Sequence, residues 1–197
     1  MTIQQFEQGW ENPASAIFVD IPNVASSRVD GRKRRIVWSA LAKAILDNND
    51  LQDTNIRYTA VYSQYKREAD VVASLIGPVM RTRLPTYVEA VTRTDKDIDS
   101  LIMNDIWQSV VGHQQSTIVR SGRLQFPLQI RHILVSGDAG YLRAYKGLAQ
   151  VYGDYLQREL IVYSWRDSLN HEFATVANQI HFLDDIPGLV QSNEPVI

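Results

Sequence analysis

Two apolar runs of the sequence each end in an aspartate. Residues 16–20 read Ala-Ile-Phe-Val-Asp, and residues 133–138 read Ile-Leu-Val-Ser-Gly-Asp. Apolar runs that are followed by turn-forming residues are typical of buried parallel strands. Parallel strands end at one edge of a sheet, so we expect Asp20 and Asp138 to lie side by side. Because neighbouring carboxylates repel each other, the pair indicates a site for a metal cation.

Basic residues surround these acids. Residues 28–96 contain 13 Lys and Arg against 8 Asp and Glu, whereas the whole chain has a net charge of −2. Ligands bind at the carboxyl ends of strands in open parallel sheets, and the segments that follow the first three predicted strands contain Arg32, Lys33, Arg34, Arg35, Lys66, Arg67 and Lys96. Such an arrangement suits a metal ion that holds one phosphate while Lys and Arg hold its neighbours. A solvated charged surface is the alternative interpretation.

Two further acids fall in one predicted helix, over residues 98–111. Asp99 and Asp105 would lie about 120° apart around that helix and about 9 Å apart along it. They therefore cannot both bind one ion, and Asp99, in the first turn, is the better ligand. We expect Asp105 to orient Lys96, Asn104 or a water molecule.

Helix and strand patterns alternate along the chain. Apolar runs predict strands over residues 16–21, 55–63, 87–91, 132–136, 160–163 and 180–183, and 3.6-residue periodicity predicts helices over 32–47, 68–80, 98–111, 139–152 and 168–178. This alternation predicts an α/β fold, a three-layer α/β/α sandwich with a mainly parallel sheet of five to six strands. Residues 116–126, with β-prone runs around Ser121-Gly122, predict an inserted hairpin. The predicted domain covers residues 15–186, with tails at 1–14 and 187–197.

Several classes of protein lack their sequence signals. The chain has no cysteine, which excludes disulfides and thiol nucleophiles. It has no Gly-rich dinucleotide motif, P-loop or nucleophile elbow. No apolar run is long enough to span a bilayer and the first residues are polar, so we expect no membrane partner and a cytoplasmic location. The sequence leaves open whether the chain forms a homo-oligomer.

Taken in order, four motifs resemble the NYN domain family of PIN-like, LabA-like nucleases. They are Phe18-Val-Asp-Ile-Pro-Asn23, Lys96-Asp-Ile-Asp-Ser-Leu-Ile-Met-Asn-Asp105, Leu134-Val-Ser-Gly-Asp-Ala-Gly-Tyr141 and the segment from Ser168 to Leu183. The resemblance implies a PIN-like α/β fold and a ribonuclease site in which Asp20, Asp99 and Asp138 bind Mg²⁺ or Mn²⁺. It departs from the family at Ile21-Pro22, where a Gly is usual, and at Gly140, where a further Asp is usual.

The leading hypothesis is therefore a metal-dependent endoribonuclease that acts on single-stranded RNA. Asp20, Asp99 and Asp138 would hold the ion, with Asp105 as a further acid of the site. Asn23 and Ser136 would hydrogen-bond to these ligands and orient them without contacting the ion. Because Gly140 removes one of four acids, the alternative is a catalytically impaired module that binds nucleic acid or protein. A third hypothesis, a small-molecule phosphohydrolase, has no pocket signature in the sequence.

Overall fold

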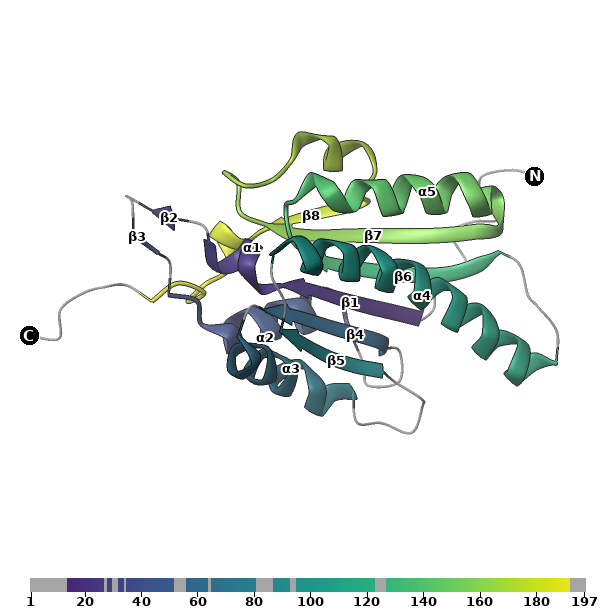
Figure 1. The fold of residues 1–197 in the computed structure, drawn as a ribbon, viewed down its shortest axis with the longest axis horizontal. Coiled ribbons are helices and arrows are strands. Elements are labelled where there is room, and N and C mark those ends of the chain that lie inside the picture. The colour runs from purple at the N-terminus through teal and green to yellow at the C-terminus, as the bar shows by residue number, and fades with distance from the viewer. Residues whose placement is uncertain are drawn as a thin grey trace, which may run out of the picture.

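The chain folds around one parallel sheet, shown in Figure 1. The computed structural model describes residues 14–26, 28–29, 32–33, 35–51, 56–63, 65–80, 87–92, 95–122 and 127–191. Six strands pair side by side in the order β5-β4-β1-β6-β7-β8, and every pairing is parallel. Their bounds are β1 Ala14–Asp20, β4 Ile56–Ser63, β5 Tyr87–Thr92, β6 Leu128–Val135, β7 Leu156–Ser164 and β8 Gln179–Phe182. A separate two-stranded hairpin joins β2 Arg28–Val29 to β3 Arg32–Lys33.

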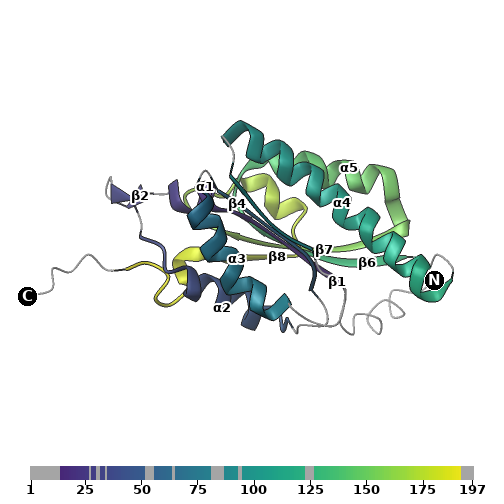
Figure 2. The ribbon, with the colours of Figure 1, turned by 60° about the horizontal axis from the view of Figure 1, so that its bottom comes forward.

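Helices cover both faces of this sheet (Figure 2). One face packs against α2 Trp38–Asn48 and α3 Lys66–Met80, and the other packs against α4 Asp95–Ser121 and α5 Leu142–Tyr152. Shorter helical segments are α1 Ile21–Ser26, η2 Ala139–Tyr141, η3 Gly153–Tyr155, η4 His171–Thr175 and η5 Leu183–Asp185. The predicted three-layer α/β/α fold is therefore confirmed.

The side chains of β1 show why both faces need a cover. Ile17 and Val19 point into the core under α2 and α3, whereas Ala16 and Phe18 point into the core under α4 and α5. Because successive residues of a strand face opposite sides, a strand buried on both faces must be apolar throughout. Burial on both faces of the sheet therefore explains why residues 16–19 form an unbroken apolar run.

The strand order reverses direction between β1 and β6. Numbered along the chain, the six strands lie in the order third, second, first, fourth, fifth and sixth. The connections from β1 and from β6 therefore leave toward opposite sides of the sheet. Sheets of this kind bind ligands in the crevice at such a reversal, outside the carboxyl ends of the strands. Asp20 ends β1 at this point, and Asp138 follows β6 by three residues.

The structure shortens two of the predicted helices. The helix predicted over 32–47 begins only at Trp38, because residues 32–33 pair with 28–29 and the backbone N–H of Val37 donates to the carbonyl of Leu189 at 2.8 Å. The helix predicted over 168–178 is mostly a 3₁₀ turn, His171–Thr175, whose first turn is capped by the Asn170 side chain. In both segments, a local cap or a long-range contact outweighs helical periodicity.

The predicted hairpin at 116–126 is wrong for the residues that the structure describes. Helix α4 continues through this segment to Ser121, and residues 123–126 lie outside the described part of the chain. Gly122 has a φ of 70°, and its N–H donates to the carbonyl of Ile118 at 2.8 Å. Ser121-Gly122 is thus a helix end and not a hairpin turn, because glycine reaches the left-handed conformation without steric cost.

The predicted C-terminal tail also begins too early. Leu189 is buried, Val190 forms a bridge with Ile36, and the N–H of Gln191 donates to the carbonyl of Arg35 at 3.0 Å. Residues 187–191 therefore pack against the segment that leads into α2. Residues 1–13 and 192–197 lie outside the described residues.

Candidate active site at the carboxyl ends of β1 and β6

Asp20 is the most deeply buried acid of the predicted site, with only 4% of its surface exposed. Its neighbour Val19 pairs in register with Val135, so the ends of β1 and β6 lie next to each other. Ser136, the first residue after β6, donates its hydroxyl to Oδ2 of Asp20 at 3.2 Å. Ser136 therefore contacts the acid that the sequence predicts it to orient.

Asn23 links the two strand ends. Its backbone N–H donates to Oδ1 of Asp20 at 3.2 Å, and its side-chain Oδ1 accepts the N–H of Gly137 at 3.0 Å. This geometry depends on the short helix α1, which begins at Ile21 directly after the strand and turns Asn23 back toward Asp20. Pro22 fits in the first turn of a helix, where its missing N–H costs nothing. Ile21-Pro22 is thus compatible with the hydrogen bonds that orient Asp20.

Tyr141 connects Asp20 to Asp99, a role that the sequence analysis missed. Its hydroxyl oxygen lies 2.7 Å from Oδ2 of Asp20 and 3.0 Å from Oδ1 of Asp99. The two carboxylate oxygens can therefore be no farther apart than the sum of these distances. Asp99 reaches the site from the first turns of α4, and Tyr141 reaches it from η2. The sequence signal that could have indicated this role is the hydroxyl of Tyr141 itself, because Tyr141 ends the motif that begins at Leu134 and contains Asp138.

Burial raises the pKa of Asp20 to about 6. Hydrogen bonds from Tyr141, from the N–H of Asn23 and from Ser136 lower this pKa in part, and the charge of Asp99 raises it. The pKa of the Tyr141 hydroxyl is also raised, first by burial and then by the charges of the two acids. At neutral pH the site thus holds a buried carboxylate beside a second acid, an arrangement that a bound cation would stabilise.

Asp138 follows β6 and faces the same edge, but its side chain also has a structural role. Oδ1 accepts the N–H of Gly140 at 2.7 Å and so caps η2. Its own N–H donates to the hydroxyl of Ser136 at 3.2 Å, so that Ser136 contacts both Asp20 and Asp138. A carboxylate that caps with one oxygen retains the lone pairs of the other for a ligand.

Asp105 has other hydrogen-bond partners than these three acids. It is 7% exposed, and its partners are the hydroxyl of Tyr62 and the side-chain amide of Asn104 at 3.4 Å. Tyr62 belongs to β4, whereas the hydroxyl beside Asp99 comes from Tyr141. Asn104 is one of the three partners that the sequence analysis names for Asp105, and the side chain of Lys96, another of them, lies outside the described residues.

The geometry of the carboxylates determines whether they can hold a metal ion. Within the ranges that the structure describes, no group of three or more Asp, Glu or His side chains is arranged to hold an ion. The Asp20 and Asp99 oxygens do converge on one point, which the Tyr141 hydroxyl occupies. Oxygen ligands of this kind are those that Mg²⁺ and Mn²⁺ prefer. The donor set fits such an ion, provided that the hydroxyl moves and Asp138 turns toward the pair.

The basic residues divide into two groups. Lys66 and Arg67 are exposed in the first turn of α3, directly after β4, and Lys66 lies 4.0 Å from Asp70. Arg32 and Lys33 lie in β3 and Arg35 is exposed, while Arg34 and the side chains of Arg32 and Lys33 lie outside the described residues. The run from Arg32 to Arg35 therefore precedes α2, and its predicted position at a helix N-terminus is wrong.

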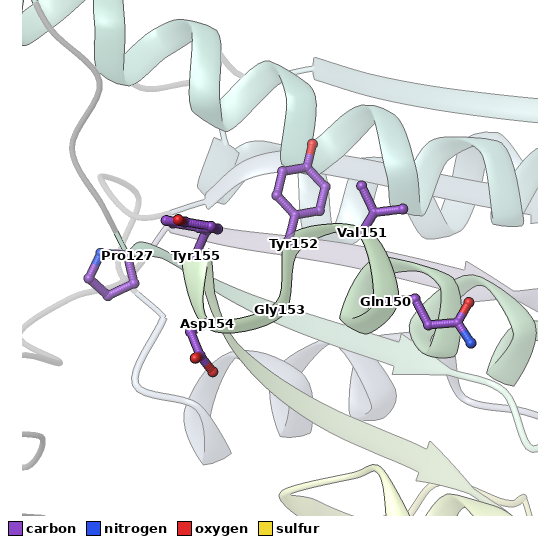
Figure 3. A pocket seen from close by; sticks show the side chains of 7 residues that line it. All are labelled: Pro127, Gln150, Val151, Tyr152, Gly153, Asp154 and Tyr155. Atoms are coloured by element: carbon purple, nitrogen blue, oxygen red, sulfur yellow. The ribbon is translucent and has the colours of Figure 1, made fainter.

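The pocket in Figure 3 lies far from these acids along the sheet. It has a volume of about 540 Å³ and is lined by residues from the end of α5 to the start of β7, together with Pro127. Because β7 starts here, the pocket lies at the amino-terminal edge of the parallel sheet. Its charged side chain is Asp154, and no acid of the candidate site lines it.

Comparison with known protein families gives no match, and comparison with curated protein sequences gives none either. Among solved structures, one similar fold is that of a protein of unknown function from Vibrio parahaemolyticus. It shares 17% sequence identity with a TM-score of 0.58, over 93% of this chain and 99% of that one. This likeness extends over nearly the whole fold and concerns the fold alone. No helix among the described residues is both long and apolar enough to cross a membrane.

Proposed function

We propose that the protein is a metal-dependent ribonuclease related to the NYN family of PIN-like nucleases. The observation that carries the proposal is the convergence of Asp20 and Asp99 on the Tyr141 hydroxyl, at the point where the strand order reverses. A fold can pair carboxylates for structural reasons alone, but an ionised carboxylate as buried as that of Asp20, beside a second acid, is costly without a cation. A second support is the exposed basic pair Lys66 and Arg67 after the neighbouring strand.

Asp20, Asp99 and Asp138 would hold the ion, which when bound supplies a water of lowered pKa and neutralises charge on a phosphate. The chain's own residues have distinct tasks around it. Ser136 and the N–H of Asn23 fix the carboxylate of Asp20, and the Tyr141 hydroxyl holds Asp20 and Asp99 together until an ion takes its place. Lys66 and Arg67 would bind phosphates of the RNA on either side of the cleaved bond.

The proposal is tested by cleavage of labelled single-stranded RNA in Mn²⁺ or Mg²⁺. We expect Asp20→Asn and Asp138→Asn each to abolish cleavage that the wild-type protein supports. Asp154→Asn is the matched control, because Asp154 is an exposed acid at the opposite edge of the sheet (Figure 3). Wild-type protein that leaves RNA intact in both metals, or cleavage that survives both substitutions, would contradict the proposal.

One observation favours a second candidate, a binding module without catalysis. Asp138 caps η2 through the N–H of Gly140, and Gly140 itself brings no carboxylate. If the cap through Oδ1 holds the other oxygen of Asp138 turned away from Asp20 and Asp99, the site keeps only two acids for an ion. Metal-independent RNA binding by a protein that never cleaves would then be the expected behaviour.

A further inference from the structure

A groove lies between the first turns of α2 and α3. It has a volume of about 390 Å³ and is lined by Trp38, Tyr65, Arg67, Glu68 and Val71. The first turn of α3 follows the carboxyl end of β4, and α2 begins at the same edge before it returns to the start of β4. The groove therefore opens at the edge of the sheet that carries Asp20.

Two aromatic side chains line this groove and differ in burial. The Tyr65 side chain precedes α3 and is 68% exposed, whereas Trp38 is half-buried and packs against the core under α2 and α3. Val71, one turn further along α3, is also exposed. An anchored indole beside an exposed phenol ring offers flat apolar surface, on which a nucleobase can stack whatever its identity.

Two basic residues at the groove can contact a phosphate, and one acid lies among them. Arg67 is one of the lining residues, and its neighbour Lys66 is exposed and lies 4.0 Å from Asp70. The acid of the lining, Glu68, accepts a hydrogen bond from the Ser63 hydroxyl at 2.8 Å, and that hydroxyl accepts the N–H of Tyr65 at 3.0 Å. Glu68 is thus held by β4, and the same contact fixes the backbone of Tyr65.

The distance from the groove to Asp20 is short enough for one RNA strand to contact both. Asp20 pairs in register with Tyr62, three residues before Tyr65. Neighbouring strands are about 4.8 Å apart, and three extended residues span at most about 11 Å. The backbone of Tyr65 therefore lies within about 16 Å of Asp20, a distance that a few nucleotides of one RNA strand can cover.

We propose that this groove is a subsite for an unpaired base of single-stranded RNA. Trp38 and Tyr65 would stack on the base, and Arg67 would contact the adjacent phosphate. This inference rests on the proposed ribonuclease function and adds to it the recognition of unpaired bases. It requires no metal, so that it can be measured separately from cleavage.

The test measures the affinity of the wild-type chain for a fluorescein-labelled, 12-nucleotide single-stranded RNA by anisotropy, with EDTA present to prevent cleavage. We expect Tyr65→Ala to weaken binding by roughly 5- to 150-fold, as loss of one stacked base predicts. Tyr65→Phe should retain the affinity, because it keeps the ring. Tyr155→Ala is the matched control, since Tyr155 is 62% exposed at the opposite edge of the sheet.

A competitor that lacks bases separates stacking from charge. An abasic ribose-phosphate strand of equal length should compete much less well than the intact RNA. Equal competition, unchanged affinity in Tyr65→Ala, or no RNA binding by the wild-type chain would each overturn the base subsite. Failure of the ribonuclease proposal looks different, because RNA binding would persist and depend on Tyr65 while cleavage would be absent or insensitive to Asp20→Asn.

Discussion

The hydroxyl oxygen of Tyr141 lies 2.7 Å from Oδ2 of Asp20, and it also lies 3.0 Å from Oδ1 of Asp99. A phenol has one proton, so it can donate fully to only one of these oxygens. When both acids are ionised, the second contact brings two electronegative oxygens together without a proton between them. The arrangement is satisfied either by protonation of one carboxyl or by a cation that takes up the second set of lone pairs.

Removal of the Tyr141 hydroxyl should destabilise the metal-free protein. We expect Tyr141→Phe to lower the free energy of unfolding by about 1–3 kcal/mol, because a buried acid loses a donor. Tyr145→Phe is the control, since the Tyr145 hydroxyl is buried without a hydrogen-bond partner among the described residues and its loss should cost little. Urea unfolding in EDTA measures both. Equal effects of the two substitutions would show that Tyr141 does not hold the acids.

Asp20→Asn should stabilise the metal-free protein above pH 6. Burial raises the pKa of Asp20 to about 6 from 3.8, so the wild type loses stability as the pH rises from about 4 through 6. The asparagine variant avoids this loss and should be about 1–3 kcal/mol more stable at pH 7.5. Below pH 4 the advantage should disappear, because the acid is then protonated in both states. A variant that is less stable than wild type at pH 7.5 would contradict this expectation.

The buried His132 should make the protein sensitive to acid. Burial lowers its pKa to about 3, and its Nε2 lies 3.0 Å from the Ser109 hydroxyl. In the unfolded chain His132 is protonated below about pH 6.5, whereas in the folded chain it stays neutral until about pH 3. The free energy of unfolding therefore falls as the pH drops from about 6.5 toward 3. We expect His132→Leu to remove this component, up to about 1.4 kcal/mol per pH unit. Between pH 7 and 4, the free energy of unfolding of the wild type should therefore fall more steeply than that of the variant. Equal slopes for the two proteins would contradict this prediction.

Gly140→Asp tests whether the site tolerates a fourth acid. Gly140 does not have a positive φ among the glycines described, and an added Cβ would lie 3.3 Å from Oδ1 of Asp138. The φ of Gly140 therefore permits a side chain, and the tight contact requires the Asp138 carboxylate to shift by a few tenths of an ångström. The new carboxylate would lie next to Asp138. We expect tighter Mn²⁺ binding and lower metal-free stability than in Gly140→Ala, which adds the Cβ without the charge. Calorimetric titration with Mn²⁺ measures the affinity, and equal affinity of the two variants would contradict the prediction.

The positions of the acids could be predicted from the sequence because they follow from single strands. An apolar run that ends in Asp20 or Asp138 contains all the information that places the carboxylate at the sheet edge. The role of Tyr141 could not be predicted in this way, because it depends on how η2 turns toward α4. The same holds for the start of α2, which is set by the contact between Val37 and Leu189, far apart in the sequence.

Local propensity misled the prediction where two signals shared the same residues. Thr117, Ile118 and Val119 are β-prone and precede Ser-Gly, which predicts a hairpin as readily as the end of a helix. The structure continues α4 to Ser121 and uses Gly122 as its cap. Packing of Ile102, Ile106 and Val110 against the sheet fixes the helix earlier in the chain, so the β-prone end continues a helix that is already formed.

A crystal soaked with Mn²⁺ gives the most direct measurement of whether these acids form a metal site. An anomalous difference map at the manganese edge should show one strong peak within coordination distance of Asp20 and Asp99, with Asp138 turned toward it and the Tyr141 hydroxyl displaced. The Asp20→Asn protein, soaked in the same way, should show no peak at that position. A wild-type map without a peak at the Asp20–Asp99 pair, at Mn²⁺ concentrations that saturate ordinary carboxylate sites, would contradict a metal-dependent ribonuclease.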